Sequence, residues 1–275
     1  MGATFDFRGK HVFVAGGSSG INLGIADAFA DAGASVAILS RSQARIDGAL
    51  QQLARHGGKV AGYAADVRNY EAVEAALAQA RAAWGAIDVL VSGAAGNFPA
   101  AALGMSANGF KAVVDIDLLG TFNVLRAAHP FLRKPGAAIL NISAGQSTHP
   151  MPMQSHVCAA KAGVDMLTRC LALEWGSEGI RVNAIVPGPI DGTEGMARLA
   201  PTDAAREAVM RRLPLGRMGR LEDVAQLALF LASSHASWIT GAIVPVDGGA
   251  SLLGGGTITA ALEAGVGTAW PWPHG

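Results

Sequence analysis

Short apolar runs alternate with longer amphipathic stretches along most of this chain. The runs are rich in Val, Ile and Ala and stay apolar at successive positions, which is typical of strands buried on both faces of a parallel sheet. We predict strands at residues 11–15, 35–40, 60–65, 87–92, 137–142, 181–186 and 242–246.

The stretches between these runs repeat apolar residues at the spacing of an amphipathic helix. Strand–helix alternation indicates βαβ units, with right-handed crossovers between parallel neighbours. The expected fold is therefore α/β: a Rossmann-like, doubly wound parallel sheet of seven strands in a single domain, with helices on both faces. We predict helices at residues 21–32, 42–55, 69–84, 108–132, 153–175 and 221–233.

Two segments are irregular in pattern. Residues 187–201 are rich in Gly and Pro, and we interpret them as a loop over the active site. Residues 254–275 form a Gly- and Pro-rich C-terminal tail, either disordered or packed on a neighbouring subunit. The folded domain is therefore expected to span residues 1–253.

Composition narrows the class of protein. Hydrophobic residues make up 51% of the 275 residues and charged residues only 15%, with 21 basic and 21 acidic side chains. This balance argues against disorder and against nucleic acid as a partner, because nucleic-acid-binding domains are usually basic. No apolar stretch reaches the roughly 18–20 residues that span a bilayer, and residues 1–10 lack the pattern of a secretory signal. We expect a cytoplasmic protein without a membrane partner.

The sequence has two cysteines, Cys158 and Cys170. Their number and spacing do not fit a metal site or a Cys-x-x-Cys redox pair. We expect no bound metal and interpret both cysteines as buried, reduced thiols.

A glycine-rich turn follows the first predicted strand and opens the first predicted helix, where residues 15–24 read Ala-Gly-Gly-Ser-Ser-Gly-Ile-Asn-Leu-Gly. Glycines let the backbone approach a pyrophosphate closely, and the helix N-terminus offers unpaired N–H groups and a favourable dipole. Such a turn alone can be only a tight loop, but its place after the first strand favours a dinucleotide site. The predicted cofactor contacts here are Gly16, Ser18, Ser19, Gly20 and Ile21.

The end of the second predicted strand indicates which dinucleotide binds. NAD sites usually carry an acidic residue there, whereas this chain has Arg41 and Ser42. A forked guanidinium and a hydroxyl suit a 2′-phosphate, so we predict NADP(H); the alternative is a solvated arginine at a helix start. Asp66 ends the third strand, where it either contacts adenine or caps the next helix.

Further motifs follow in order along the chain: Asp66-Val67, Ala94-Ala95-Gly96, Lys161, Pro187-Gly188-Pro189-Ile190 and Val246-Asp247-Gly248-Gly249. Together with the glycine-rich turn they resemble the short-chain dehydrogenases/reductases over roughly residues 6–252. The resemblance implies a homotetramer whose interfaces use the helices near residues 108–132 and 153–175. It also implies cofactor contacts from Val67, Ala94, Ala95, Lys161, Pro187, Gly188 and Ile190.

The catalytic positions of that family are altered here. A Tyr normally stands four residues before the Lys, and a Ser about thirteen before that Tyr, but these positions are Val157 and Ala144. Neither side chain can donate a proton, and Ser143 next door would point to the other side if it continues a strand. The resemblance therefore does not support ketone reduction by the usual tyrosine acid.

One branch of the family, the 2,4-dienoyl-CoA reductases and especially the peroxisomal type, shares this loss. His156 also stands five residues before Lys161, as in that branch. The branch implies reduction of a conjugated C=C bond in a small acyl thioester, as part of fatty acid metabolism. The segments that resemble it are residues 94–98, 115–117, 120–124, 187–190 and 192–195.

Such a reduction places negative charge on the thioester oxygen and a proton on a carbon, so the site needs hydrogen-bond donors and an acid. By the resemblance, Asn97 donates an amide N–H to that oxygen, and Gln146 replaces a second, tyrosine donor. Asp117 aligns with an Asp implicated in proton transfer; alternatively it holds a water or a helix backbone group. Lys161 is expected to reach the nicotinamide ribose hydroxyls.

Phe98, His156 and Asp247 are further candidate substrate contacts. His156 is an acid, a substrate contact or a satisfied structural histidine, and its small apolar neighbours favour the last interpretation. Asp247 precedes Gly248-Gly249, where ordinary turn chemistry is the favoured alternative.

The sequence thus predicts an NADPH-dependent oxidoreductase that reduces an enoyl or 2,4-dienoyl thioester by hydride transfer. Two alternatives stay open: an NADP-dependent carbonyl reductase or alcohol dehydrogenase with another acid, and a nucleotide-binding relative that has lost catalysis. Loss of both Tyr and Ser keeps the last alternative open, while retention of Asn97, Asp117 and Lys161 argues against it.

Overall fold

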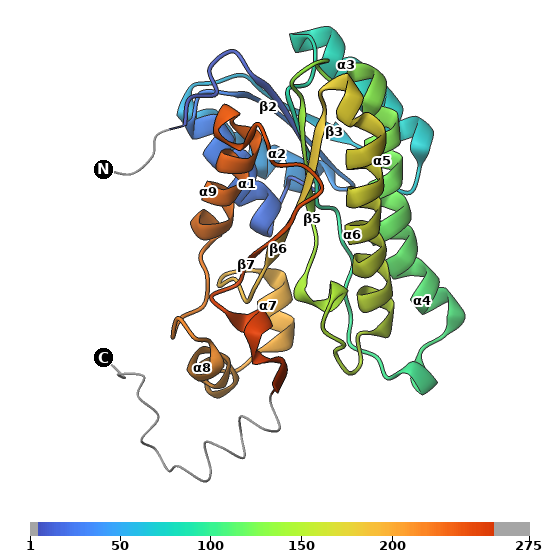
Figure 1. The fold of residues 1–275 in the computed structure, drawn as a ribbon, viewed down its shortest axis with the longest axis vertical. Coiled ribbons are helices and arrows are strands. Elements are labelled where there is room, and N and C mark those ends of the chain that lie inside the picture. Colours follow the sequence, from blue (N-terminus) through green and yellow to red (C-terminus); the bar gives the residue numbers. More distant parts are fainter. Residues whose placement is uncertain (1–4, 256–275) are drawn as a thin grey trace.

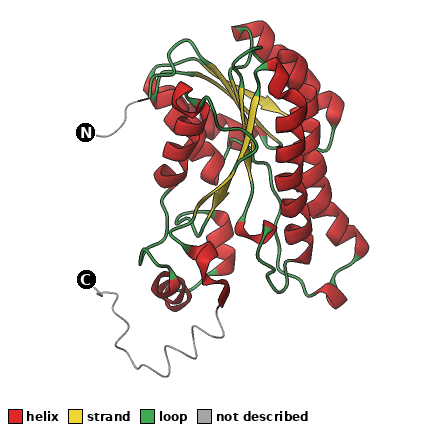
Figure 2. Ribbon diagram, viewed as in Figure 1, coloured by secondary structure: helices red, strands yellow, loops and turns green. Residues whose placement is uncertain are grey.

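The computed structural model describes residues 5–255, which form layers of helices around a sheet (Figure 1). The sheet has seven parallel strands in the order β3-β2-β1-β4-β5-β6-β7. Its strands lie between helices on either side (Figure 2). The order reverses between β1 and β4, and ligands of such sheets bind in the crevice outside the carboxyl ends of the strands at this point. The strands are β1 (His11–Ala15), β2 (Ser35–Ser40), β3 (Val60–Ala64), β4 (Val89–Ser92), β5 (Ala138–Ile142), β6 (Arg181–Pro187) and β7 (Ile243–Val246).

Helices cover both faces of the sheet, as predicted (Figure 1). Because successive side chains of a strand point to opposite faces, β1 contributes to two cores. Val12 and Val14 join an apolar cluster with α1 and α9, whereas Phe13 and Ala15 join a second cluster with α3 and α5. One face carries α1 (Gly20–Asp31), α2 (Gln43–Leu53) and α9 (Leu221–Ala232); the other carries α3 (Tyr70–Trp84), α4 (Ala107–Val114), α5 (Gly120–Ala128) and α6 (Ser155–Trp175).

A small extension lies beyond the carboxyl ends of the strands and consists of α7 (Glu194–Leu199) and α8 (Asp203–Arg212) (Figure 1). The prediction of a loop at 187–201 is therefore wrong for its second half, and α8 is not predicted at all. Thr193 and Thr202 begin the two helices, because their hydroxyls accept hydrogen bonds from N–H groups of the first turn. The extension has an apolar cluster of its own, formed by Met196, Ala200, Leu213 and Met218.

The other predicted elements lie within about two residues of the observed bounds. The predicted helix at 108–132 is α4, a π-helical turn (Asp115–Leu119) and α5 in one continuous element, followed by a short 3₁₀ turn. The predicted C-terminal tail lies outside the described residues from residue 256 onward.

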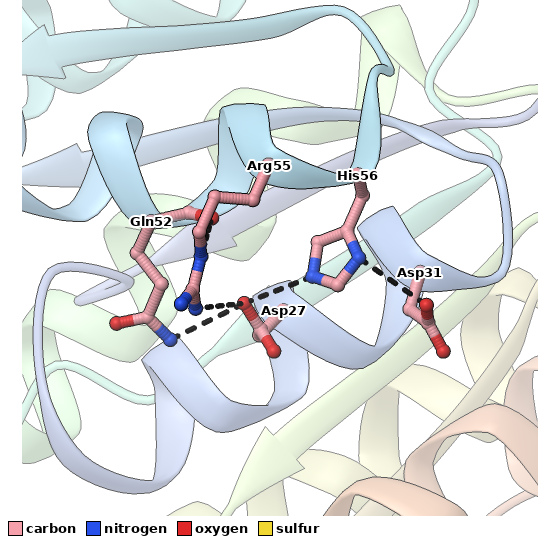
Figure 3. A network of polar contacts seen from close by, with 5 residues as sticks. All are labelled: Asp27, Asp31, Gln52, Arg55 and His56. Atoms are coloured by element: carbon pink, nitrogen blue, oxygen red, sulfur yellow. Dashed lines mark hydrogen bonds and ion pairs between the residues drawn. The ribbon is translucent and has the colours of Figure 1, made fainter.

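A polar network fastens the C-terminal end of α2 to α1 (Figure 3). The ring of His56 lies between two carboxylates of α1, with Nε2 3.2 Å from Asp27 Oδ1 and Nδ1 3.2 Å from Asp31 Oδ1. Gln52 Nε2 donates to the same Asp27 oxygen at 3.2 Å, and the Arg55 guanidinium lies 4.0 Å from it. The network holds α2 against the helix that follows the glycine-rich turn.

Within residues 5–255, no helix combines the length and the apolar character needed to cross a membrane. The expected cytoplasmic location stays a prediction. Both cysteines are free thiols, but Cys158 is only half-buried and Cys170 is exposed. The interpretation as buried thiols is therefore wrong for Cys170, which lies on the outer face of α6 beside the exposed Leu173.

Candidate functional site

The turn between β1 and α1 depends on glycine for its backbone conformation. Gly16 has a φ of +80°, and a Cβ there would lie 2.8 Å from the backbone of Ala94, so only glycine fits. A Cβ at Gly20 would meet nothing within 4 Å, and Ser19 caps α1 without a side-chain hydrogen bond in the described part of the chain. The first N–H groups of α1 thus receive no side-chain cap from Ser19, and a helix N-terminus of this kind suits a dinucleotide pyrophosphate.

Asn22 joins this turn to the segment that follows β4. Its Nδ2 donates to the carbonyl of Gly93 at 2.7 Å, and its side chain fills the space over Gly93, where a Cβ would lie 2.1 Å from Asn22 Oδ1. The sequence gives no sign of this contact, because Asn22 and Gly93 lie 71 residues apart. The structure shows that it spans the crevice between β1 and β4.

Arg41 and Ser42 lie at the carboxyl end of β2, where Arg41 is exposed and Ser42 caps α2. Asp66 does not cap the next helix, because Asn69 caps α3 instead. The carboxylate of Asp66 is held by the Arg68 guanidinium, at 3.0 Å to Oδ1 and 2.6 Å to Oδ2. These hydrogen bonds keep the pKa of Asp66 below its usual value, and the charge of Arg41 acts in the same direction.

The other predicted cofactor residues lie at the same edge of the sheet. Ala94 and Ala95 follow β4, Val67 follows β3, and Pro187 ends β6. Gly188 lies so close to β7 that a Cβ would be 2.5 Å from Asp247 Cα. The structure therefore gathers residues that are far apart in the sequence, while their contacts with a cofactor stay a prediction. The remaining members are Ser18, whose hydroxyl donates to Ser40 Oγ at 2.7 Å, the half-buried Ile21 and the buried Ile190.

A buried ion pair occupies the centre of the site. Asp117 is fully buried, and its Oδ2 lies 3.3 Å from Lys161 Nζ. Asp117 Oδ1 accepts a 2.7 Å hydrogen bond from the N–H of Gly96, and Lys161 Nζ donates to the carbonyl of Ile142 at 3.0 Å. The two predicted catalytic residues are thus in contact, between the segment after β4 and helix α6.

Asp117 lies in the π-helical turn between α4 and α5. Such turns are rare and occur frequently at functional sites, because the extra residue redirects the side chains around it. The turn is fixed on both sides: Thr121 Oγ1 donates to the carbonyl of Asp117 at 2.7 Å, and Gly120 packs against Val67, where a Cβ would lie 2.6 Å from Val67 Cγ2. Asp117 does hold a backbone group, as the alternative interpretation supposed, but the group belongs to Gly96 rather than to a helix.

Asn97 lies next to this pair and is held at both of its oxygens. Its Oδ1 accepts a hydrogen bond from Gln154 Nε2 at 2.9 Å, and its backbone carbonyl accepts one from Arg198 Nη1 of α7 at 3.0 Å. Sequence reasoning missed both partners. Gln154 stands seven residues before Lys161 and Arg198 follows the variable segment after Pro187, so position relative to known motifs was the only available signal.

Two of the predicted substrate contacts pack together beside Asn97. The rings of Phe98 and His156 lie 4.6 Å apart between centroids. His156 is fully buried, and neither ring nitrogen has a hydrogen-bond partner among residues 5–255. These contacts give no support to the interpretation as a satisfied structural histidine, and the roles of His156 as an acid or a substrate contact stay predictions.

Gln146 and Asp247 lie at the edge of the site. Gln146 is half-buried, with Nε2 3.9 Å from the sulfur of Met151. Both carboxylate oxygens of Asp247 accept backbone N–H groups, from Gly249 at 2.9 Å and from Ser251 at 2.7 Å. Burial raises the pKa of Asp247, but these hydrogen bonds outweigh it and keep the pKa below its usual value. The geometry matches turn chemistry, and a substrate role for either residue stays a prediction.

Val157 and Ala144 stand at the positions of the family's catalytic Tyr and Ser, and neither side chain can donate a proton. Val157 is 3% exposed and Ala144 is half-buried. Ser143 is buried, and its hydroxyl has no hydrogen-bond partner in the part of the chain that the structure describes. Neither Val157 nor Ala144 can therefore act as the usual acid, and a role in proton transfer for Lys161, Asp117 or His156 stays a prediction.

The chain matches known proteins over most of its length. Residues 15–251 fit the model of a family described as enoyl-(acyl carrier protein) reductase. A peroxisomal 2,4-dienoyl-CoA reductase of Pongo abelii is 44% identical over 89% of this chain and 85% of its own, and one of Saccharomyces cerevisiae is 42% identical over 90% and 86%.

Solved structures of short-chain dehydrogenases and reductases are also similar to this chain. A short chain dehydrogenase from Bacillus anthracis is 35% identical with a TM-score of 0.80, covering 89% of this chain and 97% of its own. Levodione reductase is 29% identical with a TM-score of 0.85, covering 90% and 99%. The sheet order, the glycine-rich turn and these similarities lead to one conclusion: the chain belongs to the short-chain dehydrogenase/reductase family.

Proposed function

We propose that the chain is an NADPH-dependent reductase of 2,4-dienoyl-CoA thioesters. Membership of the family implies a nicotinamide dinucleotide cofactor. The choice of NADP(H) over NAD(H) is supported by Arg41, which follows β2 and is exposed, at the position where NAD sites usually carry an acidic residue. The choice of substrate is supported by the relatives, which are named for this reaction, and by the chemistry of the site.

The observation that carries the proposal is that the family's catalytic tyrosine is replaced by Val157 while its lysine is kept as Lys161. A ketone needs an acid that protonates its oxygen, and Val157 cannot supply one. A conjugated thioester instead needs donors to an oxygen that stays unprotonated and a proton for a carbon. Asn97 beside the buried Asp117–Lys161 pair offers both kinds of group.

Bound NADPH would supply the hydride that adds to the far end of the conjugated system. Asn97 then faces the developing negative charge on the thioester oxygen and donates its Nδ2–H to it. Lys161 is held by the carbonyl of Ile142 and by Asp117, so its ammonium is fixed near the site. This pair is the route by which we expect a proton to reach the substrate carbon next to the thioester.

NADPH oxidation by the purified protein tests the proposal, with a 2,4-dienoyl-CoA, a 2-enoyl-CoA and a set of ketones as substrates. Turnover is expected with the dienoyl thioester, and the product should be the 3-enoyl-CoA for which the relatives are named. Turnover with ketones alone would contradict the proposal. Tight NADPH binding without turnover of any of these substrates would instead identify a nucleotide-binding protein that has lost catalysis.

We further propose that the chain assembles as a homotetramer through α5 and α6. Apolar side chains are exposed along these helices, among them Phe122, Met166 and Leu173, the last 85% exposed. Their burial would remove apolar surface from water, which is the main drive for stable association. Light scattering coupled to gel filtration should give four times the mass of one chain, and a monomeric mass would exclude this assembly.

A further inference from the structure

The side-chain amide of Asn97 can serve the thioester oxygen in only one of its two orientations. An amide carries an acceptor oxygen and a donor NH₂ group on opposite sides. If the oxygen faced the thioester, two electronegative atoms would meet and the developing charge would be destabilised. What fixes the orientation of Asn97 therefore decides whether it can act at all.

In the structure the acceptor end of Asn97 faces Gln154. Its Nε2 is 2.9 Å from Asn97 Oδ1 and donates to it. With the acceptor end of Asn97 engaged in this way, the Nδ2 end is left to donate in another direction. No hydrogen bond of Asn97 Nδ2 is formed within residues 5–255.

Gln154 stands at a helix N-cap position, where a polar side chain usually accepts a hydrogen bond from the first turn of the helix. It is the N-cap residue of α6, yet its side chain makes no capping hydrogen bond in the described part of the chain. It is only 2% exposed, and its Oε1 has no partner among the same residues. A buried amide with half of its polar atoms unused costs stability, so packing alone does not explain a glutamine here.

The backbone next to Gln154 is also held in an unusual conformation. Met153 has a φ of +64°, a region that side chains other than glycine rarely adopt and that concentrates at functional sites. The carbonyl of Met153 accepts a 2.9 Å hydrogen bond from the N–H of Ala100. Segments 97–100 and 153–154 are thus joined twice, once through backbone and once through the two amides.

We propose that Gln154 is a positioning residue that turns the N–H end of Asn97 toward the thioester oxygen. The inference rests on the proposed function, because it needs Asn97 as the donor to that oxygen. Gln154 touches neither the oxygen nor the cofactor in this role, and it acts through its hydrogen bond to Asn97 alone.

Three variants test the orientation: Asn97→Ala, Gln154→Met and Gln154→Glu. Asn97→Ala removes a donor to the oxyanion and should lower kcat about 10²–10³-fold. Gln154→Met keeps the shape but leaves Asn97 free to rotate, and should lower kcat about 10-fold. Gln154→Glu at neutral pH should approach the loss of Asn97→Ala, because a carboxylate only accepts and would draw the N–H end of Asn97 toward itself.

The pH profile separates orientation from structure. Once protonated, the carboxyl introduced by Gln154→Glu can donate to Asn97 Oδ1 again, so the kcat of this variant relative to the native protein should rise as the pH falls. Gln154→Met should show no such recovery. The thermal stability of Gln154→Met should stay close to that of the native protein, because the change removes the unpaired Oε1 of Gln154 together with its hydrogen bond to Asn97, and the Kd for NADPH should not change. Gln226→Met and Gln226→Glu, at an exposed position on α9, are the matched controls.

Native-like kcat in both Gln154 variants, together with a strong loss in Asn97→Ala, would overturn the role of Gln154 and leave the proposed function standing. A Gln154→Glu profile parallel to that of the native protein would also overturn it. Native-like kcat in Asn97→Ala would remove the donor on which the inference rests. Absence of dienoyl-CoA turnover in the native protein would instead contradict the proposed function itself.

Discussion

Arg41 and Arg45 stand close together in the sequence but have different surroundings. Arg45 pairs with Glu194 of α7 at 3.1 Å, whereas Arg41 has no ion pair with any residue between 5 and 255. Arg41 is thus the guanidinium that a 2′-phosphate can engage without breaking an existing contact. This contrast makes Arg41 the residue on which cofactor preference should depend.

We expect the native protein to prefer NADPH over NADH, and Arg41→Asp to reverse the preference. Loss of a charge-assisted hydrogen bond together with a new repulsion should weaken NADPH binding by at least about 10-fold. Fluorescence titration with each nucleotide measures this change. Arg81→Asp, an exposed position on α3 on the other face, is the control; equal use of both nucleotides by the native protein would contradict the assignment.

The Asp117–Lys161 pair should contribute to the free energy of unfolding as well as to catalysis. Asp117→Asn leaves a buried ammonium without its partner, which typically costs about 3–5 kcal/mol in the free energy of unfolding. Asp117→Asn combined with Lys161→Met should cost less than the single change, because the unpaired charge is gone. Urea unfolding of the single and double variants gives the coupling energy, and additive losses would mean that the two groups do not interact.

The sequence alone indicated the candidate catalytic residues of the site, but not the residues that contact Asn97. Lys161, Asp117 and Asn97 stand at fixed distances from recognisable motifs, so their place in the fold follows from the topology. Gln154 and Arg198 contact Asn97 across 57 and 101 residues of chain. No local pattern encodes such a contact, because it arises only when the segments after β4 and β5 and helix α7 are packed together.

Among the elements, α7 links the two ends of the site. Glu194 pairs with Arg45 of α2 at 3.1 Å and with Arg198 at 3.5 Å, and Arg198 donates to the carbonyl of Asn97. The chain of contacts runs from the predicted phosphate site to the predicted thioester donor. All three charged side chains are more than half exposed, so each contact is weak and sensitive to salt.

Glu194→Gln should therefore raise the KM for the thioester by a small factor, about 2–3-fold at low ionic strength. In the native protein the KM should rise toward the same value as salt is added, because screening weakens the contacts that the variant lacks. Steady-state kinetics over a range of salt concentrations provide the measurement. A variant that keeps the full salt dependence of the native protein would show that these ion pairs do not hold α7.

Helix α9 begins with an acid-sensitive contact. Asp223 accepts hydrogen bonds from the Arg217 guanidinium at 2.7 Å and from the N–H of Arg220 at 2.7 Å. These interactions, the Arg217 bond first, lower the pKa of Asp223 from 3.8 to about 2. A carboxyl with a lowered pKa stabilises the fold above its unfolded pKa, and this stabilisation is lost as the pH falls toward the folded value.

Asp223→Asn should then cost about 1 kcal/mol in the free energy of unfolding near neutral pH, as expected for a lost helix-start interaction. The difference between native protein and variant should shrink between pH 3.8 and about 2, where the native carboxyl takes up its proton. Urea unfolding at several pH values measures it. A difference that stays constant down to pH 2 would show that the charge of Asp223 is not involved.

The elements themselves were predictable to different degrees for physical reasons. Strands buried on both faces and amphipathic helices have strong patterns, and their bounds agree closely with the structure. The π-helical turn at Asp117 depends on a local change of hydrogen bonding within a continuous helical pattern, which periodicity does not reveal. Helices α7 and α8 are short, and their threonine caps lie among glycines and prolines that suggest a loop.

For the molecule as a whole, the cofactor crevice should contribute to stability when it is filled. A ligand that binds only the folded chain at about 100 times its Kd adds about 2.7 kcal/mol to the free energy of unfolding. NADPH should therefore raise the midpoint of thermal unfolding by several degrees, and NADH at the same concentration by less. In Arg41→Asp the order of the two nucleotides should be reversed; no shift with either nucleotide would contradict the predicted site.

The extension formed by α7 and α8 has its own apolar cluster, separate from the two clusters that pack against the sheet. The part of the chain that overhangs the reacting groups thus has apolar packing of its own, and it contacts the site through polar groups such as Arg198, which donates to the carbonyl of Asn97. The sequence of the extension can therefore change separately from that of the sheet and its covering helices. The extension can be rebuilt, lengthened or exchanged to admit acyl chains of another shape, at little risk to folding, while the glycine-rich turn and the Asp117–Lys161 pair stay as they are. For protein engineering it marks residues 191–218, with Glu194 and Arg198 left unchanged, as the region to diversify first.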